Sequence, residues 1–360
     1  MTATTHYLPS NTSFVFSRSD NCLRLPLPES FPCASPEDLI TQSTRETVAS
    51  IIYVVVLPLL FVIGIITNVL NCAVFYRQGL QGRVNTLLFM LSLLDLLFII
   101  ALYARYFNYT LGQLFGKEAR VRVNIVLIRL RLVCIPDILN VISNLVSTLI
   151  SVDRCVHIAL PLQVQSLVSR RGFWVIFGVA SLALACSGQI IVFSYDTACA
   201  YYSDSQVEPT WLVIPSTFYL ENKAFLDILD SVVMFSVVPF LSLAVTAVTT
   251  TVTVVKLNYS MKWRNRCSSS SKLSGEEIGL TRMLVVISGI YIACVSPRVL
   301  TSLTRLLVPD YRPWTRLCNL VVVMETLMNV LVAINSVINF FVYISLGSKF
   351  KQTLRSLVLC

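Results

Sequence analysis

Residues 50–75 have the sequence SIIYVVVLPLLFVIGIITNVLNCAVF, which contains no charged side chain. A helix needs about 20 apolar residues to cross a bilayer, so this stretch is long enough to span a membrane. Further apolar stretches follow at roughly 84–105, 124–152, 172–195, 226–256, 281–306 and 319–345. The third is the least apolar, because Arg129, Arg131 and Asp137 lie in its first half. The pattern predicts an all-α membrane protein with seven transmembrane helices.

The composition supports a membrane protein. The chain has 360 residues, of which 55% are hydrophobic and 13% are charged, whereas a soluble domain has about 25% charged residues. The connection near 196–225 is too polar for an eighth span. We therefore expect an extracellular tail over 1–49, a seven-helix domain over 50–345, and a short amphipathic helix with the cytoplasmic C-terminus over 346–360.

The charge distribution predicts the orientation. With the N-terminus outside, the inner loops and tail carry fourteen Lys and Arg against three acids, and cytoplasmic loops favour basic residues. These bases are dispersed, so the net charge of +9 indicates lipid headgroups rather than nucleic acid as their partner. The expected location is the plasma membrane. In this orientation the glycosylation acceptors Asn11 and Asn108 fall outside.

A small set of polar residues lies within the apolar stretches. Asp95 is near the middle of the second span, where a charge costs about 2.5–3.5 kcal/mol. Asn335, Ser336 and Asn339 share one face of the seventh span because of their spacing, and Ser143 lies in the third. Such oxygens suit a small hard cation. The alternative is a polar patch that only joins the helices.

Other function classes find little support in the sequence. A secondary transporter needs ionisable residues at mid-membrane in several spans, whereas Asp95 stands alone there. A membrane enzyme needs a catalytic motif such as His-Glu-x-x-His, and the two histidines, His6 and His157, are far apart. We therefore expect neither an enzyme nor a resident cofactor, apart from an allosteric sodium ion.

The third and seventh spans carry family motifs. The segment SVDRCVHIALPL at 151–162 resembles the Asp-Arg-Tyr region of rhodopsin-like (class A) G-protein-coupled receptors. NSVINFFVYISLGSKFKQ at 335–352 resembles their Asn-Pro-x-x-Tyr motif and the amphipathic helix that follows it. Four further residues match the pattern of the family in the other spans: Asn68, Asp95, Pro239 and Pro297.

The resemblance implies roles for these residues. The sodium pocket would comprise Asp95, Ser143, Asn335, Ser336 and Asn339. Arg154 would be the switch arginine, restrained by Asp153 and by Glu277, and Tyr343 would rotate inward on activation to hold open a cleft for a heterotrimeric G-protein. The alternative for Glu276 and Glu277 is a solvated helix start, where acids favour the helix dipole.

Several positions depart from the family pattern. Val295 replaces the tryptophan expected two residues before Pro297, and Ala247 replaces a tyrosine in the fifth span. Phe340 replaces the proline of the seventh-span motif, as in invertebrate FMRFamide-type peptide receptors and gastropod chemosensory receptors, which the chain also resembles. The expected function is a receptor for a peptide or acidic small molecule, with a chemosensory receptor as the alternative.

The disulfide pairing stays open. Arg129 occupies the place where the family has a cysteine at the outer end of the third span, and Cys134 lies five residues deeper. Cys199 in the second outer loop could bond Cys134, or else Cys22, Cys33 or Cys318. An extracellular setting permits each of these pairs, and spacing alone does not select one.

Arginines dominate the predicted ligand mouth. Asp137 lies one position beyond Pro136, where an amine receptor has its aspartate, and one residue turns a side chain about 100° around a helix. An amine ligand is therefore not expected. Guanidinium groups bind carboxylates bidentately, and the expected ligand residues are Arg122, Arg129, Arg131, Asp137 and Glu325, with Arg105 and Arg305 nearby. The alternative is that the arginines pair with loop acids, namely Asp196, Asp204, Glu208 and Glu221.

Overall fold

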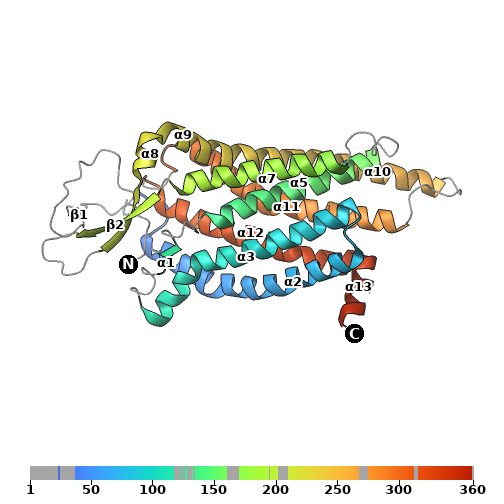
Figure 1. Cartoon of the computed structure of the whole chain (residues 1–360), viewed down its shortest axis with the longest axis horizontal. Helices are drawn as coiled ribbons and strands as arrows, with labels where there is room; N and C mark the ends of the chain where they lie inside the picture. The colour runs from blue at the N-terminus through green and yellow to red at the C-terminus, as the bar shows by residue number, and fades with distance from the viewer. Residues whose placement is uncertain are drawn as a thin grey trace.

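The computed structural model contains a bundle of long helices that run side by side (Figure 1). It describes residues 23–24, 37–116, 123, 126–127, 132, 134–159, 170–193, 195–201, 210–266, 275–311 and 315–358. A small sheet lies at one end of the bundle and the helix α13 at the other (Figure 1). We call these the sheet end and the α13 end.

Seven rods make up the bundle. They are α1–η1–α2 (Gln42–Ile51, Ile52–Val56 and Leu57–Gln78), α3 (Arg83–Phe115), α5 (Ile135–Ala159), α7 (Arg170–Val192), α9–η2–α10 (Lys223–Asp227, Ile228–Val237 and Val238–Arg266), α11 (Gly275–Leu307) and α12 (Cys318–Leu346). The short helices α8 (Thr217–Glu221) and α13 (Ser348–Val358) lie outside it. The predicted seven-helix bundle is confirmed.

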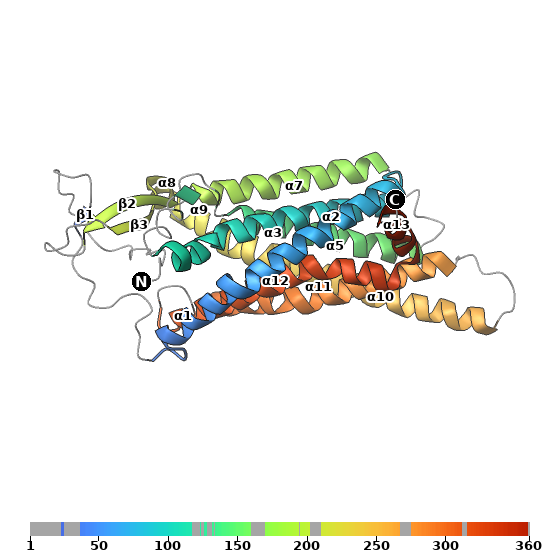
Figure 2. The same ribbon diagram turned by 90° about the horizontal axis from the view of Figure 1, so that it is seen from below.

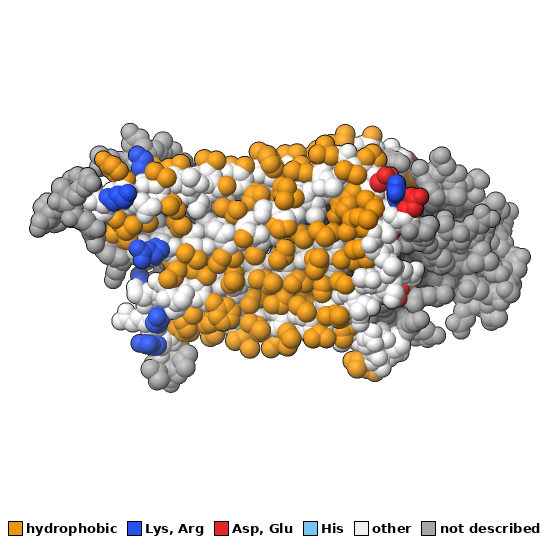
Figure 3. All heavy atoms as spheres, turned by 180° about the vertical axis from the view of Figure 1, so that it is seen from behind, with side chains coloured by type: hydrophobic (Ala, Val, Ile, Leu, Met, Phe, Trp, Pro, Cys, Tyr) orange, Lys and Arg blue, Asp and Glu red, His pale blue; other side chains and the backbone are white. Residues whose placement is uncertain are grey.

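The surface of the bundle is apolar, as a lipid-facing surface must be. In the described part of the chain, six rods are long and apolar enough to cross a membrane, and α7 contains a shorter apolar stretch, Phe177–Gly188. Large apolar side chains are exposed along these helices, including Leu59, Ile66, Leu182, Val248 and Leu300. Figure 3 shows a broad hydrophobic band between the two ends on one face of the bundle. Soluble proteins rarely expose so large an apolar patch, and the chain is therefore a multi-pass membrane protein.

α5 holds the centre of the arrangement. It packs against α3, α10, α11 and α7, while α12 closes the ring by contacting α11, α2 and α3. Figure 2 shows α7 at the edge of the bundle. One apolar core, around Leu88, Val146, Leu284 and Tyr343, fills the α13 end, and a second, around Tyr53, Leu57, Phe98 and Ala333, lies toward the sheet end.

Two wide helical turns precede prolines. The π-helix η1 ends one residue before the α2 pair Leu57–Pro58, and η2 ends one residue before Val238–Pro239. A proline lacks the N–H that an α-helix would use and its ring crowds the preceding turn. The π turns lie in the segments N-terminal to the two prolines, where that crowding acts.

Several helix boundaries differ from the prediction, most plainly in the first three spans. The first helix begins at Gln42 rather than 50, because the Thr41 side chain accepts a hydrogen bond from Thr44 N and caps it. The second extends to Phe115 rather than 105. α5 begins at Ile135 rather than 124, since Pro136 is tolerated in a first turn but not inside a helix.

The sheet was not predicted. β2 (Tyr195–Tyr201) pairs antiparallel with β3 (Thr210–Pro215), with Cys199 opposite Trp211, and β1 (Leu23–Arg24) pairs parallel with β2. The sequences YDTACAY and TWLVIP are rich in residues that favour strands. The expectation of an all-α protein holds for the bundle but not for this loop.

The amphipathic helix after the last span is confirmed as α13. Its Phe350 and Leu354 are buried in the core at the α13 end, where Phe350 packs on Phe75 with ring centroids 5.4 Å apart. Lys349, Lys351 and Arg355 lie among the remaining residues of the helix. A helix with one apolar and one basic face suits a membrane surface.

Candidate functional site

Asp95 lies at the centre of a buried polar pocket. Its Oδ1 accepts hydrogen bonds from Ser143 Oγ (2.9 Å) and Ser336 Oγ (3.3 Å), and its Oδ2 accepts one from Asn339 Nδ2 (3.0 Å). Asn335 is also buried, on the same stretch of α12. The structure thus brings α3, α5 and α12 together around the carboxylate, with four of the five predicted residues in direct contact.

Asn68 extends this pocket to α2. It is fully buried, and its Nδ2 donates to Gly64 O (3.0 Å) and to Ser336 O (3.1 Å). Its Oδ1 has no hydrogen-bond partner among the described residues. A buried polar atom in this state usually has an ordered water or ion nearby, which makes Asn68 Oδ1 a candidate contact for one.

A second cluster lies at the α13 end, around Asp153. Its side chain is 2% exposed, and its Oδ2 lies 2.6 Å from Arg154 Nη2. Arg83 Nη1, from the start of α3, lies 3.5 Å from Asp153 Oδ1, and His157 Nδ1 lies 3.4 Å from Oδ2. The predicted pairing of Arg154 with Asp153 is present, whereas the side chain of Glu277 lies outside the description.

The structure also describes three further predicted switch residues, Pro297, Pro239 and Tyr343. Pro297 lies inside α11, and Pro239 is buried in the first turn of α10. Tyr343 is fully buried and packs on Phe75, with ring centroids 5.1 Å apart. The Tyr343 hydroxyl has no hydrogen-bond partner among the described residues.

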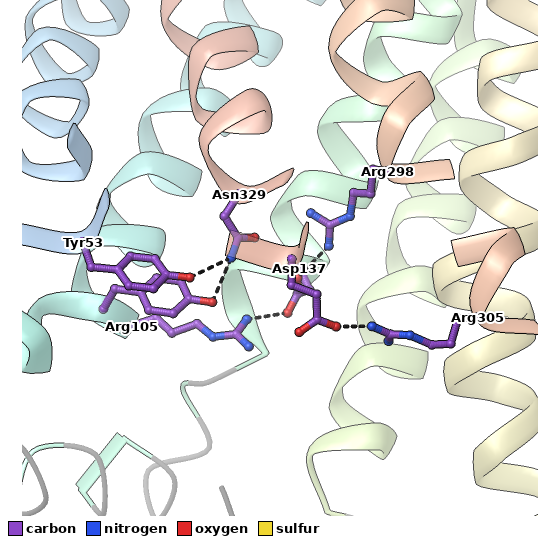
Figure 4. A network of polar contacts seen from close by, with 8 residues as sticks. Tyr53, Arg105, Asp137, Arg298, Arg305 and Asn329 are labelled. Carbon is purple, nitrogen blue, oxygen red and sulfur yellow. Dashed lines mark hydrogen bonds and ion pairs between the residues drawn. The ribbon is translucent and has the colours of Figure 1, made fainter. Parts of the chain in front are cut away.

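At the sheet end, Asp137 joins three helices. Its Oδ2 accepts a hydrogen bond from Arg105 Nη1 of α3 (2.7 Å), and its Oδ1 accepts one from Arg298 Nη2 of α11 (3.1 Å) (Figure 4). Both carboxylate oxygens are therefore engaged. Arg105 thus pairs with Asp137, and the side chains of the loop acids Asp196, Asp204 and Glu208 lie outside the described part of the chain.

Two more contacts complete the polar layer at this end. Arg305 of α11 pairs with Glu325 of α12 (Figure 4). Asn329 Nδ2 donates to Tyr106 OH (2.9 Å) and lies 3.4 Å from Tyr53 OH, and the two tyrosine rings stack with centroids 4.0 Å apart. The layer thus connects the first, second, third, sixth and seventh rods.

The N-terminal segment is attached to α12. Asp38 Oδ2 accepts a hydrogen bond from Asn319 N (2.6 Å), and Glu37 Oε2 lies 2.7 Å from Arg316 Nε.

Cys318 is disulfide-bonded, whereas Cys134 keeps its thiol. Within the described part of the chain, the disulfide-bonded cysteine is thus Cys318 rather than Cys134.

Several predicted residues lie outside the described part of the chain. They are Asn11, Cys22, Cys33, Arg122, Arg129 and Arg131. The backbone of Cys199 is described within β2, but its side chain is not.

The position of Asn108 does not agree with its predicted glycosylation. It lies inside α3 and its side chain is 5% exposed. A glycan needs an exposed asparagine amide, so this placement argues against glycosylation at Asn108.

Arg83, Arg298, Tyr53 and Asn329 were not predicted as site residues. Arg298 directly follows Pro297 in the sequence. A charged side chain next to this proline could have indicated a site residue. Tyr53 and Asn329 are single polar groups in apolar spans, which alone do not distinguish a network from an isolated hydrogen bond.

Comparison with known proteins places the chain in a wider group. The family model for the 7 transmembrane receptor (rhodopsin family) matches residues 67–343, well over half of the chain. Human Neuromedin-U receptor 1 is 33% identical over 137 residues, which are 36% of this chain and 29% of that receptor. The chain therefore spans less than a third of that relative. The family match does not favour a transporter.

Proposed function

Because the chain belongs to the rhodopsin family of seven-transmembrane receptors, we propose that it is a G-protein-coupled receptor of the plasma membrane rather than an enzyme. It binds an extracellular ligand at the sheet end and activates a heterotrimeric G-protein at the α13 end. The observation that carries this proposal is the pair of charged clusters, around Asp137 and around Arg154, at opposite ends of one bundle.

The orientation follows from charge. In Figure 3 the charged side chains that are visible at the α13 end are Lys and Arg, whereas acidic and basic side chains lie together at the opposite end. Basic residues favour the cytoplasmic side of a membrane. The α13 end is therefore cytoplasmic and the N-terminus extracellular.

The ligand is a peptide or an acidic small molecule. The sheet end presents arginines from α3 and α11, of which Arg105 and Arg298 contact Asp137. An arginine fork matches the geometry of a carboxylate. The name of the related human receptor, which refers to neuromedin-U, is consistent with this ligand class.

Activation frees Arg154. In the resting protein Arg154 is paired with Asp153, and Asp153 is also within reach of Arg83. By its spacing from Pro297, Glu277 adds a second restraint from α11. Loss of these contacts lets α11 swing outward at Pro297 and lets Tyr343 turn into the opening, where the G-protein binds.

The residues around Asp95 would hold a sodium ion as an allosteric ligand. Asp95, Ser143, Asn335, Ser336 and Asn339 offer carboxylate, hydroxyl and amide oxygens, which are the ligands that a hard cation takes. The buried Asn68 Oδ1 without a hydrogen-bond partner supports a guest in this pocket. An ion held by these residues would link α3, α5 and α12 in the resting state.

Nucleotide exchange on purified G-protein tests the proposal. The full-length receptor in lipid nanodiscs should stimulate exchange weakly, and Glu277→Ala should raise this basal rate at an equal receptor amount. Glu276→Ala is the matched control, because it removes the neighbouring acid of the same helix. If neither the wild type nor Glu277→Ala exceeds receptor-free nanodiscs, the chain is not a G-protein-coupled receptor.

A further inference from the structure

The three charged residues around Asp137 come from three different helices. Arg105 belongs to α3, Asp137 to the first turn of α5 and Arg298 to α11. Their side chains are 28%, 24% and 18% exposed, so the group is neither a solvated surface pair nor a sealed core contact. Each arginine contacts a different carboxylate oxygen.

This arrangement discriminates between ligands by their charge. Both Asp137 oxygens already accept hydrogen bonds from guanidinium groups, so an amine entering the site would meet two positive charges before it met the carboxylate. A guanidinium carries five N–H donors in a planar fork. Both arginines already donate to a carboxylate, that of Asp137. A second carboxylate fits the same donors.

The two arginines are held differently. The Arg105 guanidinium lies 5.4 Å from the centre of the Tyr106 ring, and Tyr106 is fixed by its stacking on Tyr53 and its hydrogen bond from Asn329. Arg105 is therefore held in place by side chains from η1, α3 and α12. Arg298 follows Pro297, whose missing N–H leaves one backbone bond of α11 unmade. It lies where α11 can bend with least cost.

From these contacts we propose that the Asp137–Arg298 bond restrains α11 in the resting state, and that a carboxylate of the ligand breaks it by taking Arg298 as its partner. Asp137 then stays with Arg105, so two guanidinium groups face two carboxylates and α11 is released from α5. This inference rests on the proposed function and names its ligand class, a carboxylate-bearing molecule, together with the contact through which it acts.

Basal nucleotide exchange tests the restraint without a known ligand. Asp137→Asn keeps the side-chain shape but removes its charge, and Arg298→Gln removes the other partner. Each should raise the basal rate about tenfold at an equal receptor amount, the factor that corresponds to 1.4 kcal/mol of lost restraint. Glu37→Gln is the matched control, since it removes a carboxylate from the exposed pair with Arg316 at the same end. If Asp137→Asn does not fold, Arg298→Gln decides.

The outcomes separate this inference from the proposed function. Basal rates of Asp137→Asn and Arg298→Gln equal to wild type, with a raised rate in Glu277→Ala, would overturn the restraint and leave the receptor function standing. Absence of exchange in every variant, Glu277→Ala included, would overturn both.

A second measurement tests the ligand class. The wild-type receptor is exposed to a pool of random tetrapeptides with free C-terminal carboxylates and to the same pool with amidated C-termini. The free-acid pool should stimulate exchange more strongly, and Arg298→Gln should abolish the difference. Equal responses to the two pools, including no response to either, would overturn the carboxylate assignment.

Discussion

Asp95 and Asp137 show how neighbours decide what one side chain can do. Asp95 accepts hydrogen bonds from neutral hydroxyl and amide groups, so its negative charge is still available to attract a cation. Asp137 accepts from two guanidinium groups and is already compensated. The same residue type therefore forms an arginine bridge in one place and, in our proposal, a cation site in the other.

The sodium proposal makes a prediction about Asp95 that does not require an agonist. A bound ion stabilises the folded state by RT ln(1 + [Na⁺]/Kd), about 1.4 kcal/mol at ten times Kd. The purified wild-type receptor should therefore melt at a higher temperature in NaCl than in equimolar choline chloride. Asp95→Asn should lose this difference, because the attraction for the ion depends on the charge.

Ser92→Ala is the control for that experiment. Ser92 is buried one turn from Asp95 on α3, but it donates to Leu88 O and does not contact the carboxylate. The sodium-dependent shift should persist in this variant. A shift of wild-type size in Asp95→Asn would remove Asp95 from the ion site.

At the scale of elements, the packing of α7 depends on one close approach. Gly188 lies on the face of α7 that meets α5, and a Cβ there would come within 2.6 Å of Ile138 Cδ1, with Cγ1 closer still. A glycine is needed because a side chain would occupy the space that Ile138 fills. α7 lies at the edge of the bundle (Figure 2), so this contact is one of few that hold it.

Gly188→Ala should consequently destabilise the receptor. Overpacking of a close contact costs about 1–3 kcal/mol, seen as a lower melting temperature in detergent. Gly178→Ala is the matched control, because a Cβ at Gly178 in the same helix meets nothing within 4 Å. Equal melting temperatures for both variants would show that α7 shifts to accept the methyl group.

For the whole molecule, the charge distribution and the apolar band together specify how the bundle lies in a membrane. The band in Figure 3 has basic side chains beyond one edge, and acidic and basic side chains together beyond the other. The acids and bases at the sheet end are largely paired with each other, as in Arg305–Glu325 and Arg316–Glu37. At the α13 end, Arg83 and Arg154 pair with Asp153, whereas Lys349, Lys351 and Arg355 of α13 suit contact with anionic lipid headgroups.

This asymmetry predicts the topology. An epitope tag at the N-terminus should be stained by antibody on intact cells, because the sheet end faces outward. A tag at the C-terminus should be stained only after permeabilisation. Staining of the C-terminal tag on intact cells would reverse the assignment and place both proposed sites on the wrong sides.

Much of this organisation was determined by the sequence alone. Uncharged runs longer than a bilayer is thick must become spans, because an unpaired backbone cannot remain in lipid. The polar residues of the Asp95 pocket could be predicted for the same reason, since few polar groups are tolerated at that depth and helix spacing places three of them on one face. Amphipathic spacing likewise predicted α13.

The tertiary structure decided which groups meet. Asp137 and Arg298 are 161 positions apart, and no periodicity in the sequence relates α5 to α11. Their contact depends on the rotation of both helices, which is determined by packing of the whole bundle rather than by local pattern. The start of α5 at Ile135 and the burial of Asn108 have the same origin. Local sequence determines which residues can be polar within the membrane, whereas side-chain packing between distant segments determines their partners.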